Sequence, residues 1–256
     1  MNRLILWDVD GTLVSAGRAA RDAFYDAIGA VLGREASDTG GVQMSGKTDP
    51  QIALEILATI AVSEPQAREH LPAILRALEE NLEAAVDAIR ADGRVMPGAE
   101  EVLRRLHETP GVIQTVLSGN LRANARLKLA AFGLDRWLDL DAGAYGSDAE
   151  DRVALVPIAL EHVRRSSGRA FDPREVWVIG DTPRDMDAAR AGGVRCLLVG
   201  TGRYRIDELV GVGADAVVPD LTRTDAVLSA LLDGADPAPS GVVAPGRDPG
   251  YRRAGP

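Results

Sequence analysis

The stretch Leu4-Ile5-Leu6-Trp7-Asp8-Val9-Asp10-Gly11-Thr12 decides the fold class of this chain. An apolar run ends here in two carboxylates, one residue apart, and a glycine turn. A continuous apolar run is typical of a strand that is buried on both faces of a parallel sheet. The polar residues that follow it then lie at the carboxyl edge of the sheet, where open α/β sheets bind their ligands.

Outward from this stretch, short apolar runs alternate with amphipathic helical patterns. The alternation predicts an α/β fold with a doubly wound, Rossmann-like parallel sheet. We expect strands at residues 3–9, 112–118, 137–142, 175–180, 195–199 and 215–218. Helices are expected between them, at residues 97–106, 120–132 and 153–165.

Residues 15–94 differ from the rest of the chain because they carry helical patterns, at 18–32, 50–61 and 65–90, and no convincing strand. We predict that they form an inserted helical cap domain, a mobile lid over a core made of residues 1–14 and 95–232. Residues 233–256 are rich in proline and glycine, which predicts a disordered tail.

Composition excludes several classes of function. The net charge of −9 disfavours nucleic acid and anionic membranes as partners. Cys196 is the single cysteine, so no intramolecular disulfide can form. The first apolar run is too short for a signal peptide or a membrane span, and we expect a cytoplasmic protein. The oligomeric state cannot be derived from the sequence.

Two further strand ends carry polar residues: Ser118-Gly119-Asn120, and Asp181 with Asp185 in the segment 180–185. Each alone could be a turn or a helix cap. Together with Asp8 and Asp10, they bring four carboxylates to one edge of the sheet, where their mutual repulsion requires a cation. Oxygen ligands without histidine or cysteine favour a hard ion, and Mg²⁺ fits best.

These segments, in this order, resemble the motifs of the haloacid dehalogenase superfamily of hydrolases. The helical insert is similar to the cap of its phosphoglycolate phosphatase and β-phosphoglucomutase branch. The resemblance implies Mg²⁺-dependent hydrolysis of a small phosphomonoester, a phosphoglycolate-like metabolite, through an aspartyl-phosphate. Asp10 favours phosphoryl transfer over dehalogenation, because a leaving alkoxide needs a proton donor and a halide does not.

The resemblance also implies a role for each site residue. Asp8 is the nucleophile and Asp10 the general acid and base. The metal ion is held by the Asp8 side chain, the Asp10 backbone carbonyl and Asp181, with Asp185 in or just behind that shell. The residues expected to bind the phosphate group of the substrate are Thr12, Ser118, Gly119 and Asn120.

The family normally supplies a lysine between its second and fourth motifs, and this chain departs from that pattern. Its only lysines are Lys47 and Lys128. We expect Arg152 to take the place of the lysine, since arginine keeps the charge and grips phosphate through two N–H groups. The alternative is a surface ion pair of Arg152 with Asp148 or Asp151. Lys128 lies on an amphipathic helix and is expected to face solvent.

Residues 41–48 match the pattern of a nucleotide-binding phosphate loop, ending in Lys47 and Thr48. Such a loop needs a buried strand before it, and the preceding residues are polar. Lys47 and Thr48 are instead expected to touch substrate from a cap loop, although an ordinary loop between helices explains them equally well. Three alternatives to a phosphatase stay open: a phosphomutase, a non-catalytic binding module of the same fold and a nucleotide binder.

Overall fold

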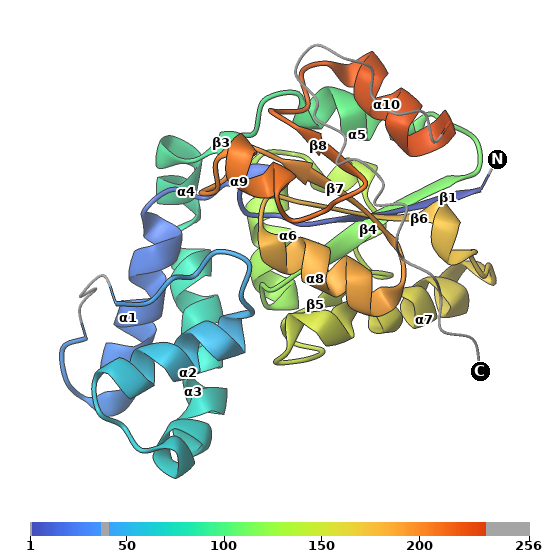
Figure 1. Ribbon diagram of the computed structural model, residues 1–256. Helices are drawn as coiled ribbons and strands as arrows, with labels where there is room; N and C mark the ends of the chain where they lie inside the picture. Colours follow the sequence, from blue (N-terminus) through green and yellow to red (C-terminus); the bar gives the residue numbers. More distant parts are fainter. Residues whose placement is uncertain (1, 37–40, 234–256) are drawn as a thin grey trace, which may run out of the picture.

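The computed structural model describes residues 2–36 and 41–233, and its centre is a six-stranded parallel sheet (Figure 1). The strand order is β5-β4-β1-β6-β7-β8, which places the first strand between β4 and β6. The sheet confirms the α/β prediction. The strands are β1 (Arg3–Trp7), β4 (Val112–Ser118), β5 (Ala144–Tyr145), β6 (Val176–Gly180), β7 (Arg195–Val199) and β8 (Ala216–Val218).

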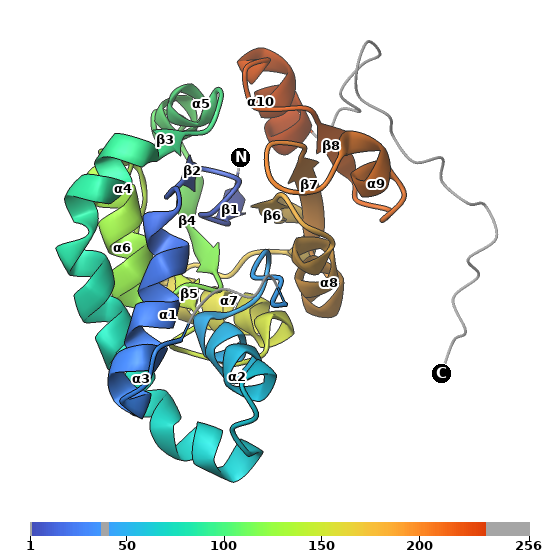
Figure 2. The same cartoon turned by 90° about the vertical axis from the view of Figure 1, so that its left-hand side faces the viewer.

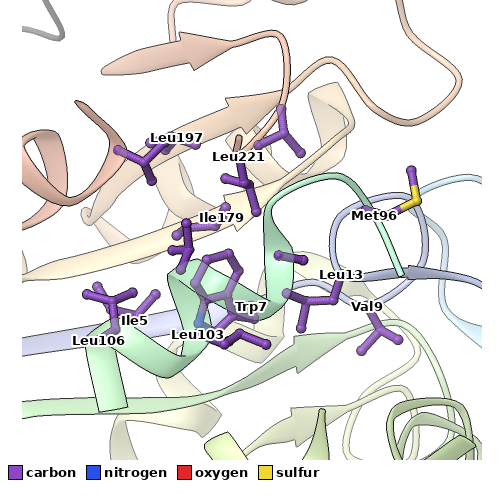
Figure 3. Packing of buried hydrophobic residues seen from close by; sticks show 14 of the residues in the cluster. Ile5, Trp7, Val9, Leu13, Met96, Leu103, Leu106, Ile179, Leu197 and Leu221 are labelled. Carbon is purple, nitrogen blue, oxygen red and sulfur yellow. The ribbon is translucent and has the colours of Figure 1, made fainter. Parts of the chain in front are cut away.

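Helices cover both faces of the sheet because alternate residues of β1 point to opposite sides. Ile5 and Trp7 belong to one buried cluster, which Figure 3 shows from close by, with Leu103 and Ile179. Leu4 and Leu6 belong to the other cluster. Helices α5 (Ala99–His107), α6 (Arg122–Ala131) and α10 (Thr224–Asp233) contribute to the first, and α7 (Leu155–Ser167), α8 (Pro183–Gly192) and α9 (Ile206–Val210) to the second.

Four helices between β1 and α5 form a separate body beside the sheet, the helical insert (Figures 1 and 2). They are α1 (Ala19–Leu32), α2 (Asp49–Thr59), α3 (Glu64–Ala84) and α4 (Val86–Asp92). Ile28, Ile56 and Leu78 lie in its own hydrophobic cluster. The expected helix over 65–90 is interrupted at Ala85, whose φ and ψ of −90° and 5° leave the helical range.

The insert is entered and left through a small antiparallel pair, β2 (Val14–Ser15) and β3 (Arg94–Val95). The expectation of no strand within 15–94 is therefore wrong at its two end residues. Each strand has only two residues, which is too short for an alternating pattern to be visible in the sequence. The pair joins the two connections between insert and sheet.

The strand expected at 137–142 is also wrong. A 3₁₀ turn, Asp135–Trp137, is followed by irregular chain, and the edge strand is β5, two residues beyond the expected range. The apolar residues of the segment, Trp137, Leu138 and Leu140, pack against the first core cluster without pairing in the sheet. Burial rather than pairing thus explains the apolar pattern.

Two other expectations concern the ends of the chain and membranes. The tail predicted to be disordered lies, apart from Asp233, outside the described residues. In the described part of the chain, no helix combines the length and the apolar character needed to cross a bilayer.

Candidate active site

Asp8 lies directly after β1, at the carboxyl edge of the sheet. Its backbone N–H donates to the Ile179 carbonyl at 2.8 Å, which continues the pairing of β1 with β6. The side chain is buried, and its Oδ1 lies 2.9 Å from Nη2 of Arg152. Burial raises the pKa of Asp8 to about 6, although the Arg152 guanidinium opposes the shift. The negative charge of Asp8 is therefore only partly balanced by the positive charge of Arg152.

Asp181 and Asp185 occupy the end of β6 and the first turn of α8. Asp185 Oδ2 accepts hydrogen bonds from the backbone N–H and the hydroxyl of Thr182, at 3.0 and 2.7 Å. Its Oδ1 contacts Nη2 of Arg152. Burial, with the neighbouring Asp8 and Asp185 charges, raises the pKa of Asp181 well above its usual range. Asp185 is fully paired, whereas Asp181 is not.

Glycines allow the chain to pass close to Asp181. A Cβ atom on Gly11 would lie 2.5 Å from Asp181 Oδ2, and one on Gly202 only 1.6 Å from the same atom. Gly11 also has a φ of +86°, which disfavours any residue with a side chain. Thr12 is buried, with its hydroxyl 3.4 Å from Asp181 Oδ1, and it does not line the cavity described below.

Asp8, Asp181 and Asp185 could together hold a metal ion. One carboxylate oxygen from each lies within 4.8 Å of the others, and all three residues are buried. The guanidinium of Arg152 pairs with Asp8 and Asp185 but not with Asp181, so a divalent cation would relieve the remaining repulsion among the three carboxylates. The donor set is entirely oxygen, which fits a hard ion.

A second network surrounds Asp10, which follows β1, and includes Ser118 at the end of β4. Asp10 Oδ2 accepts hydrogen bonds from Lys128 Nζ at 2.7 Å and from Asn120 Nδ2 at 2.8 Å. Lys128 Nζ also donates to Asn120 Oδ1 at 2.6 Å. Asn120 Nδ2 lies 2.8 Å from the Ser118 hydroxyl oxygen. The network thus joins three of the predicted site residues to Lys128.

The expectation that Lys128 faces solvent is wrong, since only 5% of the residue is exposed. Leu121 and Ala125 stand seven and three positions before Lys128, which places all three on one face of α6. Leu121 and Ala125 are buried, so that face points inward. The signal was present in the sequence, but the charge of the lysine masked it.

Arg152 lies in the 3₁₀ turn Arg152–Ala154, just before α7, and reaches inward to Asp8 and Asp185. The alternative of a surface ion pair does not occur. Asp148 Oδ2 accepts from the Tyr145 backbone N–H, and Asp151 Oδ1 from that of Val153. Asp148 also lies 3.7 Å from Nη2 of Arg122, so neither acidic neighbour pairs with Arg152.

The loop before α2 brings the insert against the sheet. Lys47 Nζ is bonded to Glu55, and Lys47 lines the cavity. The Thr48 hydroxyl donates to the Glu150 carbonyl at 2.6 Å and accepts from the Gln51 N–H at 3.3 Å, as the N-cap of α2. Gly119 permits this approach, because its Cβ would lie 2.0 Å from the Lys47 carbonyl oxygen.

The loop does not have the surroundings of a nucleotide-binding phosphate loop. In the described part of the chain, the element before it is helix α1 rather than a strand. The ammonium of Lys47 is occupied by Glu55. The structure gives no support to the nucleotide-binding alternative.

A cavity of about 240 Å³ lies between the insert and the sheet edge. Asp8, Asp10, Asp181, Ser118 and Lys128 line it from the core. Phe24, Met44 and Ile52 line it from the insert, together with Arg21. These insert residues escaped the sequence analysis because apolar side chains in a helical domain give no signal that separates a cavity wall from a core.

Asp49 was also missed. It is buried at the start of α2, and its Oδ2 accepts from the Leu121 backbone N–H at 2.7 Å and from Asn124 Nδ2 at 3.1 Å. Burial raises its pKa to about 6. In the sequence, Asp49 stands between the loop 41–48 and the helix expected at 50–61, and nothing local points to its partners at the start of α6.

Comparison with known proteins identifies the family and the fold. The family model for haloacid dehalogenase-like hydrolases matches residues 2–193. The chain is 28% identical over 214 residues to the tyrosine-protein kinase PtkA of Mycobacterium tuberculosis, covering 80% of this chain and 64% of that protein. It thus spans less than two thirds of this relative's length.

Two further proteins are similar over most of their length. Phosphoglycolate phosphatase of Pseudomonas syringae pv. tomato is 27% identical over 230 residues, covering 86% of this chain and 78% of that protein. The crystal structure of CbbY from Rhodobacter sphaeroides in complex with phosphate superposes with a TM-score of 0.66. It is 21% identical and the match covers 87% of this chain and 96% of that chain, which supports the fold. With carboxylates after β1 and β6, a hydroxyl on the last residue of β4 and a family match over most of its length, this chain belongs to the haloacid dehalogenase-like hydrolases.

Proposed function

We propose that this protein is a Mg²⁺-dependent phosphatase that hydrolyses a small phosphomonoester, such as a phosphoglycolate-like compound, through an aspartyl-phosphate. The observation that carries the proposal is the placement of Asp8. It is a buried carboxylate with one cationic partner, Arg152, and it lines a cavity that also holds Asp10, two residues further along the chain. A nucleophile and a proton donor therefore share one cavity.

The metal ion would be held by Asp8 and Asp181, with the Asp10 backbone carbonyl as a further oxygen ligand. Asp185 uses both its oxygens on Thr182 and Arg152, so its role is to orient Arg152 from just behind the ion. When bound, Mg²⁺ neutralises the charge of the transferring phosphoryl group. This assignment also supplies the positive charge that three buried carboxylates need.

Each step of the reaction can then be assigned to particular residues of the chain. Asp8 attacks phosphorus and Asp10 gives a proton to the leaving oxygen; Asp10 then takes a proton from the water that hydrolyses the aspartyl-phosphate. Arg152 holds Asp8 and balances the incoming phosphate charge, in place of the lysine that the family normally uses. Ser118 accepts from Asn120, which leaves its O–H free to donate to a phosphate oxygen beside Gly119.

The wall that the insert contributes points to the class of leaving group. Phe24, Met44 and Ile52 are apolar, and Arg21 adds a positive charge beside them. A cavity of about 240 Å³ accommodates a small substrate rather than a protein segment. We propose that the substrate is a small phosphorylated metabolite, and that Lys47 contacts it from the loop before α2.

The test is phosphate release from a panel of phosphorylated metabolites and p-nitrophenyl phosphate, with and without Mg²⁺. Asp8→Asn is the decisive variant, and Asp207→Asn, at an exposed residue paired with Arg205, is the matched control. We expect release that requires both Mg²⁺ and Asp8 and is unchanged in the control. Borohydride reduction of the enzyme quenched during turnover, followed by mass spectrometry, should find Asp8 converted to homoserine, as an aspartyl-phosphate requires.

Two further assays separate the alternatives. Isomerisation of a sugar phosphate without net phosphate release would identify the protein as a phosphomutase instead of a phosphatase. ATP-dependent labelling of tyrosine is measured as well, because the mycobacterial relative is named a tyrosine-protein kinase. Absence of any Asp8-dependent phosphate release would contradict the proposed function.

A further inference from the structure

We infer that Lys128 is a positioning residue for Asp10, an inference that rests on the proposed function. Its Nζ lies 2.7 Å from Asp10 Oδ2 and 2.6 Å from Asn120 Oδ1. Asn120 in turn donates to the same Asp10 oxygen at 2.8 Å. The three side chains form a closed ring of hydrogen bonds in which one carboxylate oxygen is held from two directions.

The burial of Lys128 needs an explanation beyond packing. An ammonium group loses hydration when it is buried, and it keeps its charge only where anions and acceptors replace the water. The buried neighbours on its helix face are Leu121, Asn124 and Ala125, of which only Asn124, a hydrogen-bond donor to Asp49, is polar. An apolar residue at position 128 would therefore also pack in this environment. The buried charge of Lys128 thus indicates a role in the active site.

The ring determines which oxygen of Asp10 is free to contact the substrate. Lys128 and Asn120 both donate to Oδ2, and Oδ1 receives no hydrogen bond from a residue in the described ranges 2–36 and 41–233. Two N–H donors occupy Oδ2, so Oδ1 is the oxygen that is left to contact the substrate. The side chain of Asp10 remains 43% exposed, which leaves room for contact with substrate.

Proton transfer from Oδ1 then balances in both halves of the reaction. As Asp8 forms its bond to phosphorus, the bond to the leaving oxygen breaks and that oxygen takes the Asp10 proton, leaving a carboxylate. In the second half, water attacks phosphorus and gives a proton to Oδ1 of Asp10, as the bond between phosphorus and Asp8 breaks. Lys128 stabilises the carboxylate that exists between the two steps.

The two buried cations of the site thus have different partners. Arg152 contacts Asp8 and Asp185, whereas Lys128 contacts Asp10 and Asn120. Asp49 is a further anion whose charge interacts with that of Lys128. One cation supports the nucleophile and the other supports the proton donor.

The leaving group provides the test, because proton donation matters most when the leaving alkoxide is strongly basic. The kcat/KM of Lys128→Met is compared with that of the wild type for an alkyl phosphate from the panel and for p-nitrophenyl phosphate. We expect a loss of about 100-fold or more for the alkyl phosphate and less than about tenfold for p-nitrophenyl phosphate. Inhibition by inorganic phosphate should be unchanged, since Lys128 acts through Asp10.

Arg126→Met is the matched control, on the same helix with an exposed side chain paired to Asp141, and it should leave both activities unchanged. Asn120→Ala removes the other donor to Oδ2 and should show the same preference for the aryl substrate, which keeps the inference testable if Lys128→Met fails to fold. Equal losses on both substrates with weaker phosphate inhibition would overturn the inference and make Lys128 a phosphate ligand. If the wild type hydrolyses neither substrate in an Asp8-dependent way, the proposed function itself fails.

Discussion

Asp49 Oδ2 accepts a 2.7 Å hydrogen bond from the backbone N–H of Leu121, so a carboxylate of the helical insert serves as a partner for the start of α6 in the core. The first N–H groups of a helix have no partner within the helix, and here a distant segment supplies one. The contact lies next to the ring of Asp10, Asn120 and Lys128. Insert and active site are therefore linked through one helix.

Asp49→Asn should change how stability depends on pH. The folded protein holds the pKa of Asp49 at about 6, above the value of an unfolded chain, so its contribution to stability is full below about pH 4 and is lost as pH rises through 6. Asparagine does not titrate. The free energy of unfolding of the variant, relative to the wild type, should therefore rise by about 1–3 kcal/mol between pH 4 and pH 7.

Urea denaturation at several pH values measures this difference. Asp87→Asn, at an exposed residue paired with Arg90, serves as the control and should show no such slope. A difference that stays constant across the pH range would contradict the raised pKa of Asp49.

Thr48→Val tests whether Thr48 serves structure or substrate. The variant keeps the shape but loses the hydroxyl that donates to Glu150 and caps α2, so we expect a loss of about 1–2 kcal/mol of stability. Because the hydroxyl is already used by these partners, KM should change little. The matched control is Thr59→Val, whose hydroxyl donates to a carbonyl within its own exposed helix end. A large rise in KM in Thr48→Val would instead establish the substrate contact expected from the sequence.

The sequence predicted the sheet and its carboxylates well because both depend on local patterns. Strands β4 and β7 have the expected bounds, since a buried strand is a continuous apolar run that ends where polar residues begin. The edge strand β5 was misplaced because its two residues pair only with the end of β4. A strand of two residues is too short to show the apolar run by which the longer strands were recognised in the sequence.

The cations and the wall of the cavity were harder to predict. Arg152 was found because the family pattern demanded a basic residue in that region. Lys128 was missed because a charge on an amphipathic helix normally faces solvent, and only the packing of α6 against the sheet reverses this. Phe24 and Ile52 reach the cavity through the placement of the insert, which depends on contacts such as that of Asp49 with Leu121 and cannot be derived from local sequence.

Arg152→Met should make the stability of the protein depend more strongly on Mg²⁺. Removing the guanidinium leaves Asp8 and Asp185 buried without their cation, which costs about 3–5 kcal/mol in the metal-free protein. A bound cation replaces part of that charge, so the increase in Tm on adding Mg²⁺ should exceed the increase in the wild type. Arg164→Met, at an exposed residue paired with Glu161, is the control for loss of an arginine. An equal Mg²⁺-induced increase in Tm in Arg152→Met and in the wild type would show that Arg152 and the metal ion do not interact with the same carboxylates.

Gly202→Ala should weaken metal binding while leaving the fold intact. The added Cβ would lie 1.6 Å from Asp181 Oδ2, so either the loop or the carboxylate must move. Asp181 has less hydrogen-bonding support than Asp185, and we expect it to be displaced while the sheet stays intact. The Mg²⁺-induced rise in Tm should then be largely lost, and phosphate release should fall by about 100-fold or more, as misplacement of a site group by about 1 Å can produce. Gly211→Ala, whose Cβ would meet its nearest neighbour at an ordinary 3.5 Å, should behave as the wild type in both measurements. A full Mg²⁺ shift together with full phosphate release in Gly202→Ala would contradict the expected displacement of Asp181 and show that the loop moves instead.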